Sequence, residues 1–172
     1  MNQHHISRMK TYYMTLPFFV LFTALNYAQK DLDSLWTEVA FTKQSTCLLG
    51  TQYTFDREGE RFKQTVFNKE PWQLLSQYDK QKTTAFLLGK LADTTKTNIH
   101  TCPFMGASNG ELAVYALQQI HSINWYDFDE FSAYANRDIT SATDSPQGWL
   151  LAILSDDSER KKLEALFRKL LD

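Results

Sequence analysis

The strongest folding signal in this chain is the segment SNGELAVYALQQI, residues 108–120. A serine followed three positions later by a glutamate is the pattern of a capping box. In that motif Ser108 accepts a hydrogen bond from the Glu111 amide, and the glutamate side chain reaches back to the serine amide. Most positions from Leu112 to Ile120 are apolar. A helix that is apolar on nearly all sides is surrounded by other elements, so we expect this one at the centre of a mainly α domain.

Apolar residues recur at helical spacing along much of the remaining chain. The pattern predicts helices close to residues 31–41, 70–79, 83–92 and 157–171, with shorter ones beginning near Asp127 and at Pro146. Asp31 and Ser145 are placed to cap the helices that follow them. Residues 42–68 are different, because alternation around residues 51–55 and a turn-like stretch after them favour a short β-hairpin within mixed structure. The fold class that follows is a compact multi-helix domain.

The two helices of residues 83–120 resemble one HEAT-like helical hairpin. A buried helix from Thr83, a loop beginning at Asp93 and a second helix reading GELAVYAL from Gly110 carry the resemblance. The chain departs from that family by a long loop containing Cys102-Pro103 in place of a tight turn, and by the lack of a clear second copy. The resemblance implies packed helix pairs, which mostly serve binding.

Residues 1–28 have the layout of a secretory signal peptide. A basic head precedes a short apolar run, and the small residue Ala28 stands at the expected cleavage point. A bilayer-spanning helix needs about 20 apolar residues, and Pro17 and several polar residues interrupt a shorter run here. We expect cleavage, a single helical domain over residues 29–172, no membrane span after cleavage, and a location in the periplasm or outside a bacterial cell. The alternatives are a start at Met9 and an uncleaved anchor.

The composition is that of one ordinary globular domain. The chain has 172 residues, of which 43% are hydrophobic and 22% charged. Its formal net charge of −2 lacks the basic character of a nucleic-acid binder. Without residues 1–28 the chain keeps 16 basic and 20 acidic side chains, a net charge of −4. An acidic domain of this kind suits a basic protein partner.

Cys47 and Cys102 are the two cysteines of the chain. In an oxidising compartment an even pair indicates a disulfide, which would stabilise the domain by about 2–4 kcal/mol. Free buried thiols and a catalytic or redox thiol are the alternatives.

The residues with the most chemical character are His100, Cys102 and Glu111. A thiolate beside an imidazole is the minimum for nucleophilic catalysis, so these three are the candidate catalytic residues of a small thiol- or metal-dependent enzyme. Together with His121 the ligand types also suit zinc, but neither Cys-x-x-Cys nor His-x-x-x-His spacing occurs. A phosphate-binding glycine loop is also missing, because Gly106-Ala-Ser-Asn-Gly110 lacks the lysine of that motif. The sequence therefore favours a protein that is not an enzyme and carries neither cofactor nor metal.

The candidate binding residues are Trp125, Tyr126, Asp127, Asp129 and Glu130. Exposed aromatic side chains anchor protein interfaces. The three acids lack the glycine turn of a calcium loop, so a charged helix start explains them better than a metal site. We expect the protein to bind a protein partner without catalysis, as an immunity or inhibitor protein that neutralises a toxic effector does. A structural envelope protein is the remaining alternative.

Overall fold

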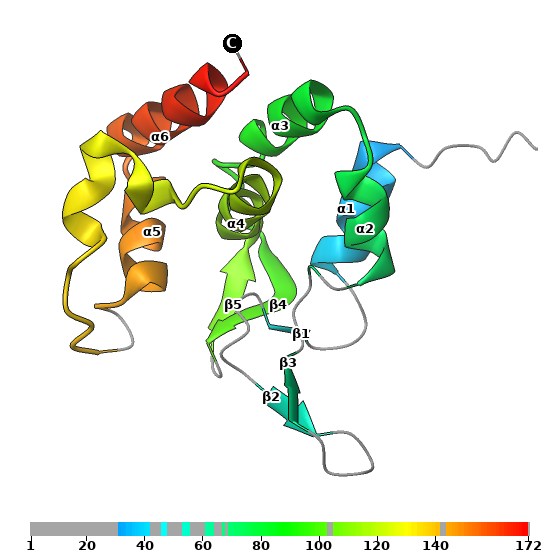
Figure 1. Cartoon of the computed structure of the whole chain (residues 1–172), viewed down its shortest axis with the longest axis horizontal. Coiled ribbons are helices and arrows are strands. Elements are labelled where there is room, and N and C mark those ends of the chain that lie inside the picture. The colour runs from blue at the N-terminus through cyan, green and yellow to red at the C-terminus, as the bar shows by residue number, and fades with distance from the viewer. Residues whose placement is uncertain are drawn as a thin grey trace, which may run out of the picture.

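The computed structural model of the protein describes residues 31–41, 46–47, 53–55, 61–63, 67, 69–102, 105–141 and 144–171 (Figure 1). Only the backbone is described for the strand residues up to 63 and for residues 101, 102 and 105. The predicted signal peptide lies outside these ranges. The described part is mainly helical, as predicted. Its helices are α1 (Leu32–Ala40), α2 (Glu70–Ser76), α3 (Lys80–Leu88), α4 (Asn109–His121), α5 (Pro146–Ser155) and α6 (Asp157–Lys169), with two 3-10 helices, η2 (Trp125–Asp127) and η3 (Asp129–Tyr134).

Helix α4 lies at the centre of the fold, with α1 and α2 on one side of it and α5 and α6 on the other (Figure 1). Residues 109–118 of this helix are all buried. The predicted capping box is confirmed, because the Glu111 amide donates to Ser108 Oγ at 3.2 Å and the Ser108 amide donates to Glu111 Oε2 at 2.8 Å. The sequence segment that best predicts a buried helix therefore forms the central one.

A polar network fixes the beginning of α4 against α1 and the turn that follows α3. Asn109 accepts a hydrogen bond from Trp36 Nε1 at 3.1 Å and donates from Nδ2 to Asp93 Oδ2 at 3.0 Å. The Gly110 amide donates to the Asp93 carbonyl at 3.0 Å. A Cβ atom on Gly110 would lie 2.5 Å from the Leu91 carbonyl oxygen, so the chain needs a glycine here. Paired polar groups and one close backbone contact thus set the position of α4.

The other helices pack around α4 and share its core. Helix α3 contacts α4 and α6, α5 contacts α4 and α6, and α1 contacts α2. The predicted caps are confirmed: Asp31 Oδ1 accepts from the Ser34 amide at 2.7 Å, and Ser145 Oγ accepts from the Gly148 amide at 3.4 Å. The largest fully buried side chains come from nearly every described element: Leu35, Leu75, Leu87, Ile99, Leu112, Leu117, Trp125, Phe131, Leu150, Leu163 and Phe167.

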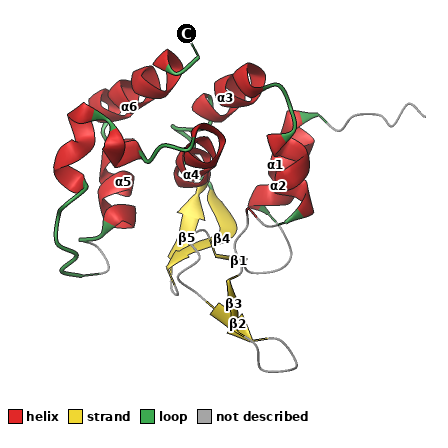
Figure 2. Ribbon diagram, viewed as in Figure 1, coloured by secondary structure: helices red, strands yellow, loops and turns green. Residues whose placement is uncertain are grey.

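Two strands occupy the connection between α3 and α4 (Figure 2). Strand β4 (Lys96–Cys102) pairs antiparallel with β5 (Met105–Ser108), and β1 (Thr46–Cys47) pairs parallel with β4 on its other side. Helices α3 and α4 do pack together, but a β-hairpin joins them instead of a helical turn. The HEAT-like character expected for residues 83–120 is therefore not confirmed.

The physical reason for this difference lies on the inner face of β4, where Ile99 is buried and Thr97 is also buried. Thr97 Oγ1 donates to the Ala107 carbonyl at 2.9 Å and accepts from the Ile99 amide at 3.2 Å. A polar side chain whose hydrogen bonds are made can be buried on the inner face of a strand. Because Thr97 is polar, residues 96–102 lack the alternation of apolar residues that would have predicted β4.

A second, separate sheet is formed by β2 (Tyr53–Phe55) and β3 (Arg61–Lys63). The two strands are antiparallel, with Thr54 opposite Phe62. The prediction of a short β-hairpin within residues 42–68 is thus confirmed.

Candidate functional site

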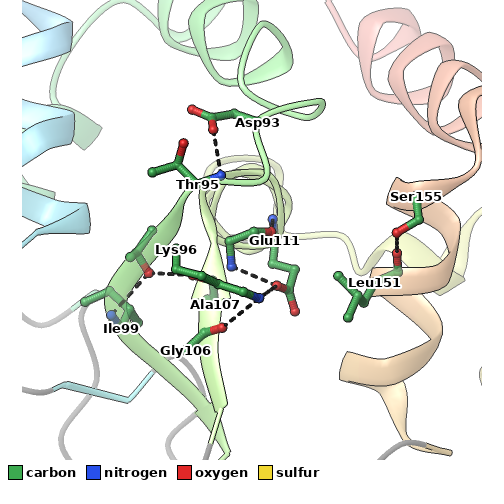
Figure 3. Close-up of polar contacts among 11 residues, drawn as sticks. Asp93, Thr95, Lys96, Ile99, Gly106, Ala107, Glu111, Leu151 and Ser155 are labelled. Atoms are coloured by element: carbon green, nitrogen blue, oxygen red, sulfur yellow. Dashed lines mark hydrogen bonds and ion pairs between the residues drawn. The ribbon is translucent and has the colours of Figure 1, made fainter.

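Glu111, one of the candidate catalytic residues, is the glutamate of the capping box described above. Its Oε2 atom accepts from the Ser108 amide and lies 4.0 Å from the Lys96 ammonium group, which also donates to the Gly106 carbonyl at 3.2 Å (Figure 3). Only 5% of the Glu111 side chain is exposed. Among the described residues, no hydrogen bond or ion pair joins Glu111 to His100. The structure therefore gives this carboxylate a structural partner and does not bring it together with the imidazole.

His100 lies in the middle of β4, half-buried, with Gly106 opposite it on β5 and Cys47 opposite it on β1. Its Nδ1 atom is buried and has no hydrogen-bond partner within the described ranges. Cys102 follows two positions later on the same strand, after an irregularity in the pairing of β4 with β5. The two cysteines thus lie on neighbouring strands of one sheet, while their side chains, and with them the predicted disulfide, lie outside the description.

The aromatic and acidic candidates occupy η2 and the beginning of η3. Trp125 is fully buried and packs edge-on against Tyr126 and Phe131, with ring centroids 5.3 and 6.0 Å away, so it belongs to the core. Tyr126 is half-buried, and Asp127, Asp129 and Glu130 are exposed. Of the candidate binding residues, only Tyr126 lines a cavity described below.

A cavity of about 340 Å³ lies beside the C-terminal half of α4. We call it the Tyr115 cavity. Its walls come from α4, from the turn that follows it, from η2 and from the first residue of α5: Tyr115, Gln118, Gln119, Ser122, Ile123, Asn124, Tyr126 and Pro146. None of these eight side chains is charged, so the cavity is polar but neutral.

Two buried polar atoms of this cavity's residues are unpaired. Tyr115 Oη and Gln118 Oε1 are shielded from solvent and have no hydrogen-bond partner in the part of the chain that the structure describes. An unpaired buried polar group costs about 1–3 kcal/mol. Burial, and then the charge of Glu111 and the nearby Tyr126 phenol, raise the pKa of Tyr115. The phenol thus remains a neutral O–H group at physiological pH.

The amide of Gln118 has a defined orientation, because a short relay of hydrogen bonds begins at a carboxylate. Asp127 Oδ2 accepts from the side-chain Nδ2 of Asn124 at 2.9 Å and from the backbone N–H of Asn124 at 2.7 Å. A carboxylate can only accept, so the NH₂ group of Asn124 must face it. Asn124 Oδ1 then accepts from Gln118 Nε2 at 3.2 Å. Gln118 Oε1 is the end of the relay, without a partner among the described residues.

The backbone at the end of α4 is also unusual. Ser122, the residue after the helix, has φ of 54° and ψ of 37°, the left-handed conformation that favours glycine. It also lines the Tyr115 cavity. Backbone strain of this kind clusters at functional sites.

A second cavity of about 330 Å³, which we call the Tyr78 cavity, lies on the other side of Gln119. Its walls come from α2, α3 and α4 and the residues between them: Trp72, Ser76, Tyr78, Lys80, Thr83, Gln119 and Ile120. Tyr78 Oη is buried and, like Tyr115 Oη, lacks a described partner. Exposed Gln119 lines both cavities, so the two lie next to each other beside the C-terminal half of α4, and we call them together the groove.

The sequence pattern did not indicate Tyr115, Gln118 or Tyr78 as site residues. The one available signal was the pair Gln118-Gln119, two amides in the largely apolar run of residues 112–120. In the described ranges no group of three or more His, Cys, Asp or Glu side chains is arranged to hold a metal ion. No helix there has the length and apolarity of a bilayer span.

Comparisons with models of known protein families, with curated proteins and with solved structures gave no match. The fold and the site together define a mainly helical domain with two cavities beside its central helix, one lined without charged side chains and one that includes Lys80.

Proposed function

We propose that this protein binds a protein partner, without catalysis, through the groove formed by the Tyr115 and Tyr78 cavities. The observation that carries the proposal is the pair of adjacent cavities, whose lining residues include three with buried polar atoms, Tyr115 Oη, Gln118 Oε1 and Tyr78 Oη, that lack described partners. Unpaired buried polar groups disfavour the free protein, and binding that reorients these side chains would allow them to form hydrogen bonds.

The charge around the groove suggests which partner it suits. Asp127 is exposed and is bonded to Asn124 in the cavity wall, and Asp129 and Glu130 are exposed immediately after it. An acidic side chain that is hydrogen-bonded to the wall of an uncharged pocket favours a basic partner and speeds its encounter. An immunity or inhibitor protein, exported to the periplasm or beyond and directed at a basic effector, fits these features best.

Photocrosslinking from within the groove tests the proposal. Gln119 is exposed and lines both cavities, so a photoreactive amino acid at this position in the native host should form an adduct with one protein. The identified protein is then purified and its affinity measured by calorimetry. We expect Gln119→Trp, which fills the groove, to weaken binding at least tenfold.

Gln81→Trp is the matched control. Gln81 is exposed on α3 and lines neither cavity, so the same substitution there should leave the affinity within about twofold. An adduct whose binding is equally sensitive to both substitutions, or to neither, contradicts the proposal. The absence of any adduct favours a structural envelope protein instead.

We further propose that Cys47 and Cys102 form a disulfide in the exported protein. Support comes from the pairing of β1 with β4, in which Cys47 lies opposite His100, two positions before Cys102 on the neighbouring strand. Intact mass after thiol alkylation should show no modification until the protein is reduced. Immediate alkylation of Cys102 would favour the alternative of a thiol-dependent enzyme with His100.

A further inference from the structure

We infer that the Tyr78 cavity receives a carboxylate, the side chain of an aspartate or glutamate of the partner, which pairs with the Lys80 ammonium group. A partner that is basic overall would place this one acidic side chain at the Lys80 end of the groove and its basic side chains near Asp127. The source of the carboxylate rests on the proposed function, whereas the chemistry of the cavity can be tested without any partner.

The charge of the Tyr78 cavity comes from a single residue. Lys80 is the one charged side chain among the seven described residues that line it. The lysine is exposed and forms no hydrogen bond or ion pair with any other part of the chain that the structure describes. Asp79, the acid beside it in sequence, does not line the cavity and accepts from the Lys82 amide at 2.9 Å as the cap of α3. The cavity therefore carries a positive charge that no lining acid neutralises.

The contacts between α3 and α4 show on which side of α3 this lysine lies. Lys80 and Thr84 are four positions apart on α3 and share one face of the helix. Thr84 Oγ1 lies 2.9 Å from His121 Nε2, so this face is turned toward α4. Burial, and then the Lys80 ammonium group, lower the pKa of His121, which agrees with an ammonium group on that side. Lys80 thus lies where Gln119 and Ile120 of α4 form the opposite wall of the cavity.

The position of Lys80 in its helix does not stabilise α3. Lys80 is the first residue of α3, and the first turn of this helix has no acidic side chain. The beginning of a helix carries a partial positive charge, which disfavours a cation there. The lysine and the helix therefore add to the same positive potential, and a bound anion would relieve both.

The free hydrogen-bond donors of the cavity match one carboxylate. Ser76 Oγ and Thr83 Oγ1 already donate to backbone carbonyl groups three and four positions earlier, at 2.9 and 3.0 Å. The Gln119 side chain is exposed and has no hydrogen bond within the described ranges, so its NH₂ group can donate. The Lys80 ammonium group and the Gln119 amide thus supply donors for the two oxygen atoms of one carboxylate.

Other chemical groups fit the Tyr78 cavity less well. Lys80 repels an ammonium or guanidinium group. A carboxamide has the shape of a carboxylate but forms no charge-assisted hydrogen bond with the lysine. A phosphate dianion would bring a second negative charge for which no second cation lines the cavity. An aliphatic group would remove water from the ammonium group without replacing it.

The test uses three probes, the N-acetyl N′-methylamides of glutamate, glutamine and lysine, of which the first two have nearly the same shape. Each is titrated at constant ionic strength into the protein as purified from its host, while the backbone amide signals are followed by NMR. We expect saturable shifts around Lys80, Thr83 and Gln119 with the glutamate probe, about fivefold weaker binding of the glutamine probe and none of the lysine probe. Added salt should weaken binding of the glutamate probe alone. Equal binding of the glutamate and glutamine probes, strongest binding of the lysine probe, or the lack of saturable shifts with the glutamate probe overturns the inference.

Variants of two lysines locate the interaction. Lys80→Gln should reduce the affinity for the glutamate probe to that for the glutamine probe, and Lys80→Arg, which keeps the charge, should restore most of it. Lys82→Gln is the matched control, because Lys82 is exposed on the same helix and lines neither cavity. It should leave the affinity within about twofold. Equal losses in Lys80→Gln and Lys82→Gln would show attraction by the general charge of α3, which contradicts the inference.

The imidazole of His121 gives a second readout close to the proposed site. Its pKa can be measured from the NMR signals of the ring protons. Lys80→Gln should raise this pKa and Lys82→Gln should leave it unchanged. Saturation with the glutamate probe should raise it too, because the carboxylate neutralises the ammonium group. An unchanged pKa of His121 upon saturation places the carboxylate away from Lys80, and the inference is then wrong.

The two proposals fail in different ways. If a partner is crosslinked from Gln119 and blocked by Gln119→Trp while the glutamate and glutamine probes bind equally, the carboxylate inference is wrong and the binding function stands. If the glutamate probe binds selectively through Lys80 while no partner is crosslinked, the chemistry of the cavity stands and the proposed function is wrong.

Discussion

Replacing Tyr115 by phenylalanine removes one oxygen atom next to the Tyr115 cavity and leaves the ring in place. The oxygen is buried without a described partner, and such a group costs about 1–3 kcal/mol. The gap left by one oxygen atom costs a few tenths of a kcal/mol at about 24 cal/mol per Å³. We therefore expect Tyr115→Phe to raise the free energy of unfolding by about 1 kcal/mol. For a chain of this length that corresponds to a rise in Tm of about 3 °C.

Urea unfolding followed by circular dichroism measures this difference, and Thr84→Val provides the matched control. Thr84 is also buried, but its hydroxyl is paired with His121 Nε2 at 2.9 Å. Removing a paired hydroxyl leaves the imidazole without its partner and should lower the free energy of unfolding by about 1 kcal/mol. Opposite signs for the two substitutions are the expected result. If Tyr115→Phe destabilises the protein as much as Thr84→Val does, the phenol is satisfied within the fold and the basis of the binding proposal is lost.

Two further predictions concern the packing of α4 and its histidine. Gly110→Ala should destabilise the protein by about 1–2 kcal/mol in urea, because its Cβ would lie 2.5 Å from the Leu91 carbonyl oxygen, which outweighs the gain in helix propensity. Gly89→Ala, whose Cβ would approach the nearest atom only to 3.3 Å, should change stability by less than about 0.5 kcal/mol. Burial, and then the Lys80 ammonium, lower the pKa of His121 below that of the unfolded chain. The contribution of His121 to stability should therefore be complete above about pH 6.5 and should be lost as the pH drops through the lowered pKa. We expect the urea midpoint to decrease between pH 7 and pH 5 by a smaller amount in His121→Asn than in the wild type.

The sequence predicts those parts of the fold that depend on local chemistry. The capping box at Ser108, the caps at Asp31 and Ser145, and the apolar run of α4 each act within one turn of helix, so their patterns can be read directly. Strand β4 depends on contacts with β1 and β5, and a buried, satisfied threonine at position 97 replaces one of the apolar residues that would signal a strand. Pairing between distant segments is therefore the part of this fold that the sequence pattern left undetermined.

The candidate site is less predictable from sequence for a related reason. A tyrosine and a glutamine on an apolar helix look like core residues, since most such groups find a partner within the fold. Whether they do so depends on the turn after α4 and on the direction in which Asn124 and Gln118 point, which is set by Asp127. The sequence indicated Tyr126 and Asp127 only through their aromatic and acidic character. It could not indicate that Tyr126 lines the Tyr115 cavity while Asp127 orients Asn124 in its wall.

The two ends of α4 show where this domain departs from ordinary packing. At the beginning, Asn109 and Glu111 are buried polar residues whose hydrogen bonds are made. From its middle onward, Tyr115 and Gln118 are equally buried, yet one oxygen atom of each has no partner among the described residues, and the helix stops at Ser122 in a left-handed conformation. One helix with a satisfied start and an unsatisfied, strained end is hard to explain by stability alone, because the same chain shows at residue 109 how such groups are paired. Natural sequences break local rules mainly at functional sites. The binding function is therefore best sought at the C-terminal end of α4.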